Sequence, residues 1–124
     1  MVLVDTSVWI RGLANREPYR RDLDRLLSAG EVMGHEFVYG ELLIGDRGGR
    51  RKLLAAYEVL PKAAVVPHLE IVEFVQRRGL HGRGVGWIDI HLLASAIVDR
   101  VQLWTADPRF KALAEELGVG YEGP

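Results

Sequence analysis

Four acidic residues stand at positions where a surface acid is not expected, and together they could bind a divalent metal ion. They are Asp5, Glu41, Asp89 and Asp107. Carboxylate oxygens are hard ligands that favour Mg²⁺, with Mn²⁺ as an alternative, over zinc. Such an ion lowers the pKa of water, orients it for in-line attack on a phosphodiester and stabilises the leaving oxygen. If the fold brings the four acids together, they predict metal-assisted phosphodiester cleavage.

Two of the acids come after predicted strands. Asp5 follows Val2–Val4 directly, and Asp107 follows Val101–Trp104 within a few residues. Ligand sites in open α/β sheets lie beyond the carboxyl ends of the strands. Each acid also has a simpler interpretation as the N-cap of the next helix, and Pro108 strengthens that interpretation for Asp107.

Two hydroxyl residues stand beside these strand-end acids. Ser7 is two residues after Asp5, and Thr105 is two residues before Asp107. A hydroxyl group can hold a carboxylate or a metal-bound water by a hydrogen bond. We therefore include Ser7 and Thr105 as supporting polar residues of the predicted site.

The other two acids lie on predicted helices, each next to apolar residues. Helical spacing places Glu41 on the face of Phe37, Val38 and Ile44. Asp89 stands at the start of a core-facing stripe made by Leu92, Leu93, Ala96 and Ile97. Acids that interrupt an apolar stripe are expected at functional sites. The alternatives are a buried ion pair with an arginine for Glu41 and a helix cap for Asp89.

The elements that must position these residues alternate along the chain. The predicted strands are Val2–Val4, Val32–Gly34, Ala64–Val66, Val101–Trp104 and Val119–Glu122. Between them, apolar periodicity predicts helices at 19–29, 37–44, 50–60, 69–78, 87–100 and 108–118. This alternation predicts an α/β fold with a parallel sheet and helices on both faces.

Length and composition limit the class of protein. The 124 residues are 48% hydrophobic and contain no cysteine, which predicts a single domain over 1–124 and excludes disulfides and thiolate metal sites. No apolar run approaches the roughly 20 residues needed to cross a bilayer, and no signal peptide is visible, so we expect a soluble cytoplasmic protein. With a net charge of −1, nucleic-acid binding would depend on metal ions or on local basic patches, at 47–52 and 77–83.

The four acids stand in sequence motifs that resemble those of PIN domains. The opening motif is Asp5-Thr6-Ser7-Val8-Trp9-Ile10, and the second is Glu41-Leu42-Leu43. The third and fourth are Asp89-Ile90-His91-Leu92-Leu93-Ala94-Ser95-Ala96 and Leu103-Trp104-Thr105-Ala106-Asp107-Pro108-Arg109-Phe110. Each motif is weak alone, but four in the right order over Val2 to about Leu117 are specific.

Within this family, the chain most resembles VapC toxins of type II toxin–antitoxin pairs. The resemblance implies a three-layer αβα sandwich, Mg²⁺-dependent endonucleolytic cleavage of RNA, homodimerisation and inhibition by a VapB-like antitoxin. It also implies that Asp5, Glu41, Asp89 and Asp107 are the metal-site acids, with Asp107 the most variable position. The alternatives are a PIN-type nuclease that acts in RNA processing or on DNA, and a non-catalytic binding domain of the same fold.

Some residues depart from the family pattern or have other interpretations. His91 lies two residues beyond Asp89, so we expect it at the surface or in an interface. The segment Gly79–Gly86 is rich in glycine, which indicates a mobile or tightly turning loop. No pair of histidines has metal-ligand spacing. The three tryptophans could stack on bases, although their apolar surroundings favour packing in the core or in an interface.

Overall fold

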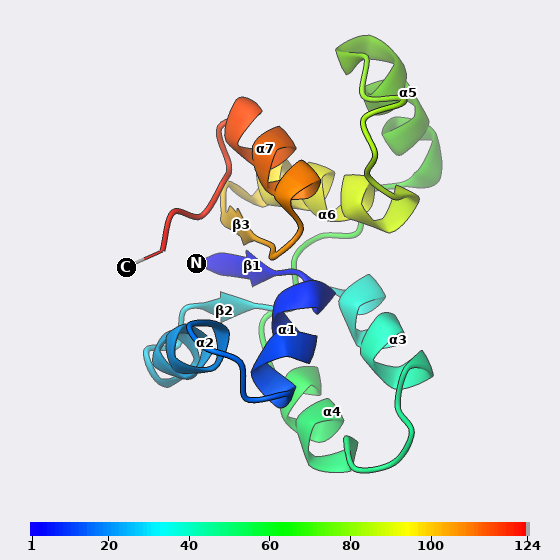
Figure 1. Cartoon of the computed structure of the whole chain (residues 1–124). Coiled ribbons are helices and arrows are strands. Elements are labelled where there is room, and N and C mark those ends of the chain that lie inside the picture. The colour runs from blue at the N-terminus through cyan, green and yellow to red at the C-terminus, as the bar shows by residue number, and fades with distance from the viewer. Residues whose placement is uncertain (124) are drawn as a thin grey trace.

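The fold is built on a small parallel sheet. The computed structural model describes residues 1–123 and contains the strands β1 (Val2–Val4), β2 (Val32–Met33) and β3 (Gln102–Trp104). Their order in the sheet is β2-β1-β3, and Val2 pairs with Val32 on one side and with Gln102 on the other (Figure 1). The predicted parallel sheet is therefore confirmed.

Helices make the crossovers that parallel neighbours require. The helices within residues 1–123 are α1 (Thr6–Leu13), α2 (Tyr19–Ser28), α3 (Glu36–Ile44), α4 (Arg51–Glu58), α5 (His68–Arg78), α6 (Trp87–Asp99) and α7 (Pro108–Glu116). In Figure 1, α5, α6 and α7 lie on the β3 side of the molecule and α1 to α4 on the β2 side. Three parallel strands flanked by helices agree with the predicted three-layer α/β sandwich.

The core is centred on β1 and α6. Val2, Leu3 and Val4 are all nearly or completely buried, as expected for a central strand whose two faces are covered. In α6, every residue from Ile90 to Ala96 is buried. A helix buried all round does not show a one-sided apolar stripe.

The burial of α6 corrects the prediction for His91. This residue is only 5% exposed, and its ring packs edge-on against Phe37 and Trp87. We expected it at the surface or in an interface because it lies off the helix face of Asp89. The surface position is wrong because α6 buries several faces and not one, while the interface position stays a prediction.

Two predicted strands do not form. In place of Ala64–Val66, the structure has an isolated bridge between Gly34 and Lys62. The backbone of Ala64 is instead satisfied by side chains of α6: its N–H donates to Asp99 Oδ2 (2.8 Å), and its carbonyl accepts from Ser95 Oγ (2.6 Å). The last predicted strand, Val119–Glu122, is likewise reduced to one bridge, between Leu103 and Gly120.

The glycine-rich loop turns through left-handed backbone conformations. Gly79 ends α5 with a φ of 61°, and Gly82 and Gly84 have φ values of 70° and 78°. The side chain of Arg83 is hydrogen-bonded to Glu116, which connects the loop to α7.

Among the helices of residues 1–123, none has the length and apolar character needed to span a bilayer.

Candidate active site

The carboxyl ends of β1 and β3 meet at Asp5. The backbone N–H of Asp5 donates to the carbonyl of Trp104 (2.9 Å), so the two strand ends lie side by side. Asp5 is 5% exposed, and its Oδ2 accepts hydrogen bonds from Ser7 Oγ and Thr105 Oγ1, both at 2.8 Å. Asp5 occupies the N-cap position of α1, but its side chain makes no capping hydrogen bond. Holding the helix end is therefore not what orients this carboxylate.

The two hydroxyl groups are themselves fixed by backbone donors. Ser7 Oγ accepts from the N–H of Ala106 (3.0 Å), and Thr105 Oγ1 accepts from the N–H of Asp107 (3.1 Å). Because each hydroxyl receives a backbone hydrogen bond, its own proton is directed to Asp5. The supporting role predicted for Ser7 and Thr105 thus has a geometric basis.

Glu41 lies on α3 and is held by α1. Its Oε1 accepts a hydrogen bond of 2.7 Å from Thr6 Oγ1. Within residues 1–123 it forms no ion pair, so the alternative of a buried pair with an arginine is wrong. The predicted apolar face is only partly real, because Val38 is buried while Ile44 is 88% exposed.

Asp89 lies in the first turn of α6 and also caps that helix. Its Oδ2 accepts the N–H of Gly86 (3.0 Å), so the cap interpretation is correct. Burial raises the pKa of Asp89 to about 6, against the lowering effect of that hydrogen bond. The negative charges of Asp5, Glu41 and Asp107 raise this pKa further. The three other acids therefore lie close enough to Asp89 to act on its ionisation.

Asp107 is the N-cap of α7, as its position before Pro108 indicated. Its Oδ1 accepts from the N–H groups of Arg109 (2.9 Å) and Phe110 (3.5 Å). The interpretation of Asp107 as a helix cap is therefore correct. It does not remove Asp107 from the acidic group, because its charge acts on the pKa of Asp89.

The donor set of the four acids fits a hard divalent cation. Within residues 1–123, the hydrogen bonds to each of these carboxylates end on only one of its two oxygens. Each group is thus oriented by one oxygen and has the other left for a ligand. However, among the described residues no three His, Asp or Glu side chains lie close enough together, as they stand, to hold a metal ion. The structure gathers the acids, and their roles as metal ligands and catalysts stay predictions.

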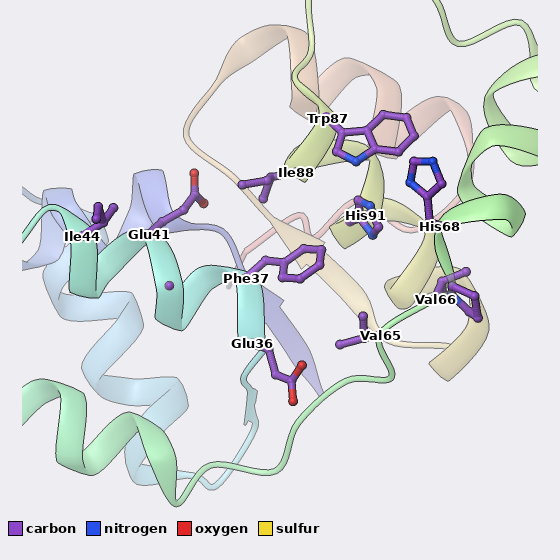
Figure 2. Close-up of a pocket in the computed structure, with 12 residues that line it drawn as sticks. Glu36, Phe37, Glu41, Ile44, Val65, Val66, His68, Trp87, Ile88 and His91 are labelled. Carbon is purple, nitrogen blue, oxygen red and sulfur yellow. The ribbon is translucent and has the colours of Figure 1, made fainter.

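An apolar groove of about 660 Å³ begins next to Glu41. Figure 2 shows Phe37 of α3 pointing toward His91 of α6, with Trp87 and His68 beyond it. The Nδ1 atom of His91 is buried and has no hydrogen-bond partner among the described residues. Trp87 is 45% exposed here, whereas Trp9 and Trp104 are buried in the core.

Two positioning residues were not identified from the sequence. Thr6 holds Glu41, and the only signal for it was its place between Asp5 and Ser7. His35 is fully buried and caps α3: its Nδ1 accepts from Phe37 N (3.0 Å). Its Nε2 lies 3.0 Å from Ser95 Oγ in α6, so it links the helices of Glu41 and Asp89. A single histidine before an apolar run gives no sequence signal for that link.

Comparisons with known proteins agree with this geometry. The PIN domain family model matches residues 2–116. Ribonuclease VapC32, from two strains of Mycobacterium tuberculosis, is 42% identical over 120 residues, which make up 96% of this chain and 94% of the relative. PIN nucleases in general depend on divalent metal ions. The chain therefore belongs to the PIN-domain family and, within it, to the VapC ribonucleases.

Proposed function

We propose that this protein is an endoribonuclease that acts as the toxin of a type II toxin–antitoxin pair and requires Mg²⁺. The observation that carries the chemistry is the acidic group around Asp89, whose pKa is raised by burial and by three neighbouring carboxylates. The similarity to a ribonuclease named VapC supports RNA as the substrate and toxicity as the role.

The four acids would bind the cation, and neighbouring hydroxyl groups would keep two of these acids in a fixed orientation. Asp5, Glu41, Asp89 and Asp107 supply the carboxylate oxygens, while Ser7, Thr105 and Thr6 hold two of those groups from behind. When bound, Mg²⁺ supplies activation of a water molecule and compensation of the charge that develops on the phosphate. Asp89 titrates near pH 6, so at neutral pH most of it is ionised and ready to bind a cation.

The activity is tested with purified protein and a labelled RNA. We expect internal cleavage with Mg²⁺ or Mn²⁺, and none in EDTA. A DNA oligonucleotide of the same sequence serves as the matched control. Cleavage of both polymers at equal rates would favour the alternative of a general PIN-type nuclease, and cleavage of neither would favour a binding domain of this fold.

The toxin role is tested in cells. We expect expression to arrest growth and co-expression of a small VapB-like protein, encoded directly upstream, to relieve the arrest. A location in the cytoplasm, where RNA is available, is part of this proposal. Normal growth on expression of an active enzyme would contradict the toxin role and would leave the ribonuclease role intact.

We also propose a homodimer in which a second copy covers the apolar groove. The groove is lined by apolar side chains that are unusually exposed, among them Ile44 (88%), Trp87 (45%) and Val65 (39%). Exposed apolar patches of this kind mark protein interfaces. Its lining residues lie on α3, on the segment 65–67 with the start of α5, and on α6, and the surface that they form could pair with its own copy in a two-fold arrangement.

A further inference from the structure

A second cavity, of about 460 Å³, lies at the end of β3, between α2, α7 and residues 121–123. The aromatic side chains of Tyr19, Trp104 and Tyr121 line it, and Asp22 of α2 and Glu122 near the C-terminus contribute carboxylates. The ring centroids of Trp104 and Tyr121 are 5.3 Å apart, and those of Trp104 and Tyr19 are 6.2 Å apart. The cavity therefore combines aromatic surface with acidic side chains.

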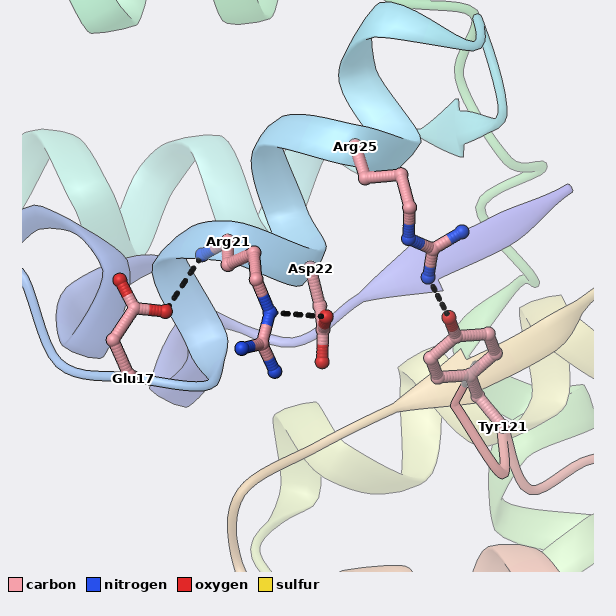
Figure 3. A network of polar contacts seen from close by, with 5 residues as sticks. All are labelled: Glu17, Arg21, Asp22, Arg25 and Tyr121. Carbon is pink, nitrogen blue, oxygen red and sulfur yellow. Dashed lines mark hydrogen bonds and ion pairs between the residues drawn. The ribbon is translucent and has the colours of Figure 1, made fainter.

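Asp22 is buried without a hydrogen-bond donor. The residue is 7% exposed, and within residues 1–123 no group donates a hydrogen bond to its carboxylate. Its one ionic partner is its neighbour Arg21, whose Nε lies 3.5 Å from Oδ1 and whose side chain is 70% exposed (Figure 3). The start of α2 favours a negative charge at this position, and the carboxylate oxygens are accessible from the cavity, not sealed in the core. A buried carboxylate that faces a cavity is suited to a ligand that brings donors with it.

This cavity shares a wall with the acidic site. Thr105 and Ala106 line the cavity, while the Thr105 hydroxyl donates to Asp5 and the Ala106 N–H donates to Ser7. Lys111 of α7 also lines the cavity and can attract a phosphate there. A group bound in the cavity would thus lie next to a phosphodiester held at the acids.

We propose that the cavity is a base-binding subsite for a guanine of the RNA substrate, next to the bond that is cleaved. The Watson–Crick edge of guanine presents two adjacent donors, N1–H and the N2 amine, which match the two oxygens of the Asp22 carboxylate. Proteins recognise unpaired RNA bases by this combination of an aromatic surface and polar contacts to the base edge. This inference rests on the proposed ribonuclease function and adds a base preference to it.

A protein partner is the competing occupant, because an arginine guanidinium also pairs with a carboxylate and stacks on aromatic rings. Thr105 and Ala106 favour RNA as the occupant, because they line the cavity and also contact Asp5 and Ser7. A base in the cavity would therefore lie beside the phosphodiester that is cleaved.

The test is a binding titration in EDTA, so that it does not depend on cleavage. We would titrate the full chain with 5′-GMP, 5′-IMP and 5′-AMP and follow the indole N–H signals of the three tryptophans by NMR. IMP lacks the N2 amine of guanine, and AMP lacks both donors. We expect GMP to bind most tightly, to shift the Trp104 signal and not that of Trp87, and to lose on the order of tenfold in affinity in Asp22→Asn.

The matched control is Asp24→Asn, because Asp24 lies on the same helix with a side chain that is 68% exposed. We expect this variant to bind GMP as the unchanged protein does. Equal binding of the three nucleotides would overturn the proposal, and so would undiminished GMP binding by Asp22→Asn. Arginine amide is titrated in the same way, and tighter binding of it than of GMP at Trp104 would also overturn the proposal. If Asp22→Asn does not fold, the comparison of GMP with IMP on the unchanged protein decides. GMP binding without RNA cleavage would contradict the ribonuclease function and keep the subsite.

Discussion

The hydroxyl of Thr105 donates a hydrogen bond of 2.8 Å to Asp5 Oδ2, although the two residues are 100 positions apart in the sequence. The contact joins the ends of two neighbouring parallel strands, β1 and β3. Both residues are 5% exposed. It fixes the orientation of the Asp5 carboxylate, which stands at the N-cap position of α1 but makes no capping hydrogen bond.

We expect Thr105→Val to reduce RNA cleavage at saturating Mg²⁺ by roughly 10- to 100-fold, as is usual when a residue that orients a metal ligand is lost. Valine keeps the shape of threonine and removes the hydrogen bond to Asp5. The apparent affinity for Mg²⁺ should fall as well, measured by titrating activity with the metal. Thr105→Ser keeps the hydroxyl and should recover most of the activity. Equal loss in both variants would show that packing matters here, and not the hydrogen bond.

We expect Asp5→Asn to abolish RNA cleavage, with a loss of at least about 100-fold, because it removes a negative charge from the predicted cation site. The fold should persist, since the amide keeps the volume of the carboxylate, and circular dichroism and thermal unfolding check this. Asp24→Asn is the control, as an exposed acid outside the site. Full Mg²⁺-dependent activity of Asp5→Asn would contradict the role of Asp5 as a metal-site acid.

The contribution of His35 to stability should fall as the pH is lowered from about 6.5 to about 4, whereas that of Asp89, whose pKa is raised by burial, should change in the opposite direction. Burial, and secondly the nearby His91, lower the pKa of His35 from 6.5 to about 4. Over this interval the unfolded chain takes up a proton that the folded protein does not, so His35 costs up to about 3 kcal/mol of unfolding free energy at the acid end. Urea unfolding at a series of pH values measures this dependence.

The variant that isolates His35 is His35→Asn, since asparagine also caps helices but does not titrate. Relative to the unchanged protein, its unfolding free energy should become larger as the pH is lowered from about 6.5 to about 4, because the cost of the neutral, buried His35 is absent. His81→Asn, at an exposed position, should not change the dependence. Carboxylates contribute to all three proteins, so the measured quantity is the difference between them. Identical curves for His35→Asn and the unchanged protein would contradict the prediction.

We expect Ile44→Glu to convert the proposed homodimer into a monomer, as measured by light scattering after size-exclusion chromatography. Ile44 is 88% exposed and borders the apolar groove, so a charge there should disrupt an interface and leave the free energy of unfolding of one subunit within about 0.5 kcal/mol. Val59→Glu is the matched control, at an 83% exposed position that does not line the groove. A monomeric unchanged protein, or equal effects of both variants, would remove the groove from the dimer proposal.

The sequence by itself determined the fold class and the group of acids. Val2–Val4 is apolar throughout, and a run of that kind is typical of a central strand covered on both faces, which directly places Asp5 at a strand end. Asp107 follows another strand by the same local logic. The order of the acids in four motifs then indicated the family before any geometry was available.

Only the tertiary structure decided how the acids are held and what surrounds them. The contact of Thr6 with Glu41 spans 35 positions, and the burial of His91 depends on segments packing against α6 from several sides. The cavity of Asp22 and Trp104 likewise forms between elements distant in the chain. Periodicity reports which face of an element is apolar, because it reflects burial averaged along that element. It carries no information about which side chain of another segment meets that face, because packing in three dimensions makes that choice.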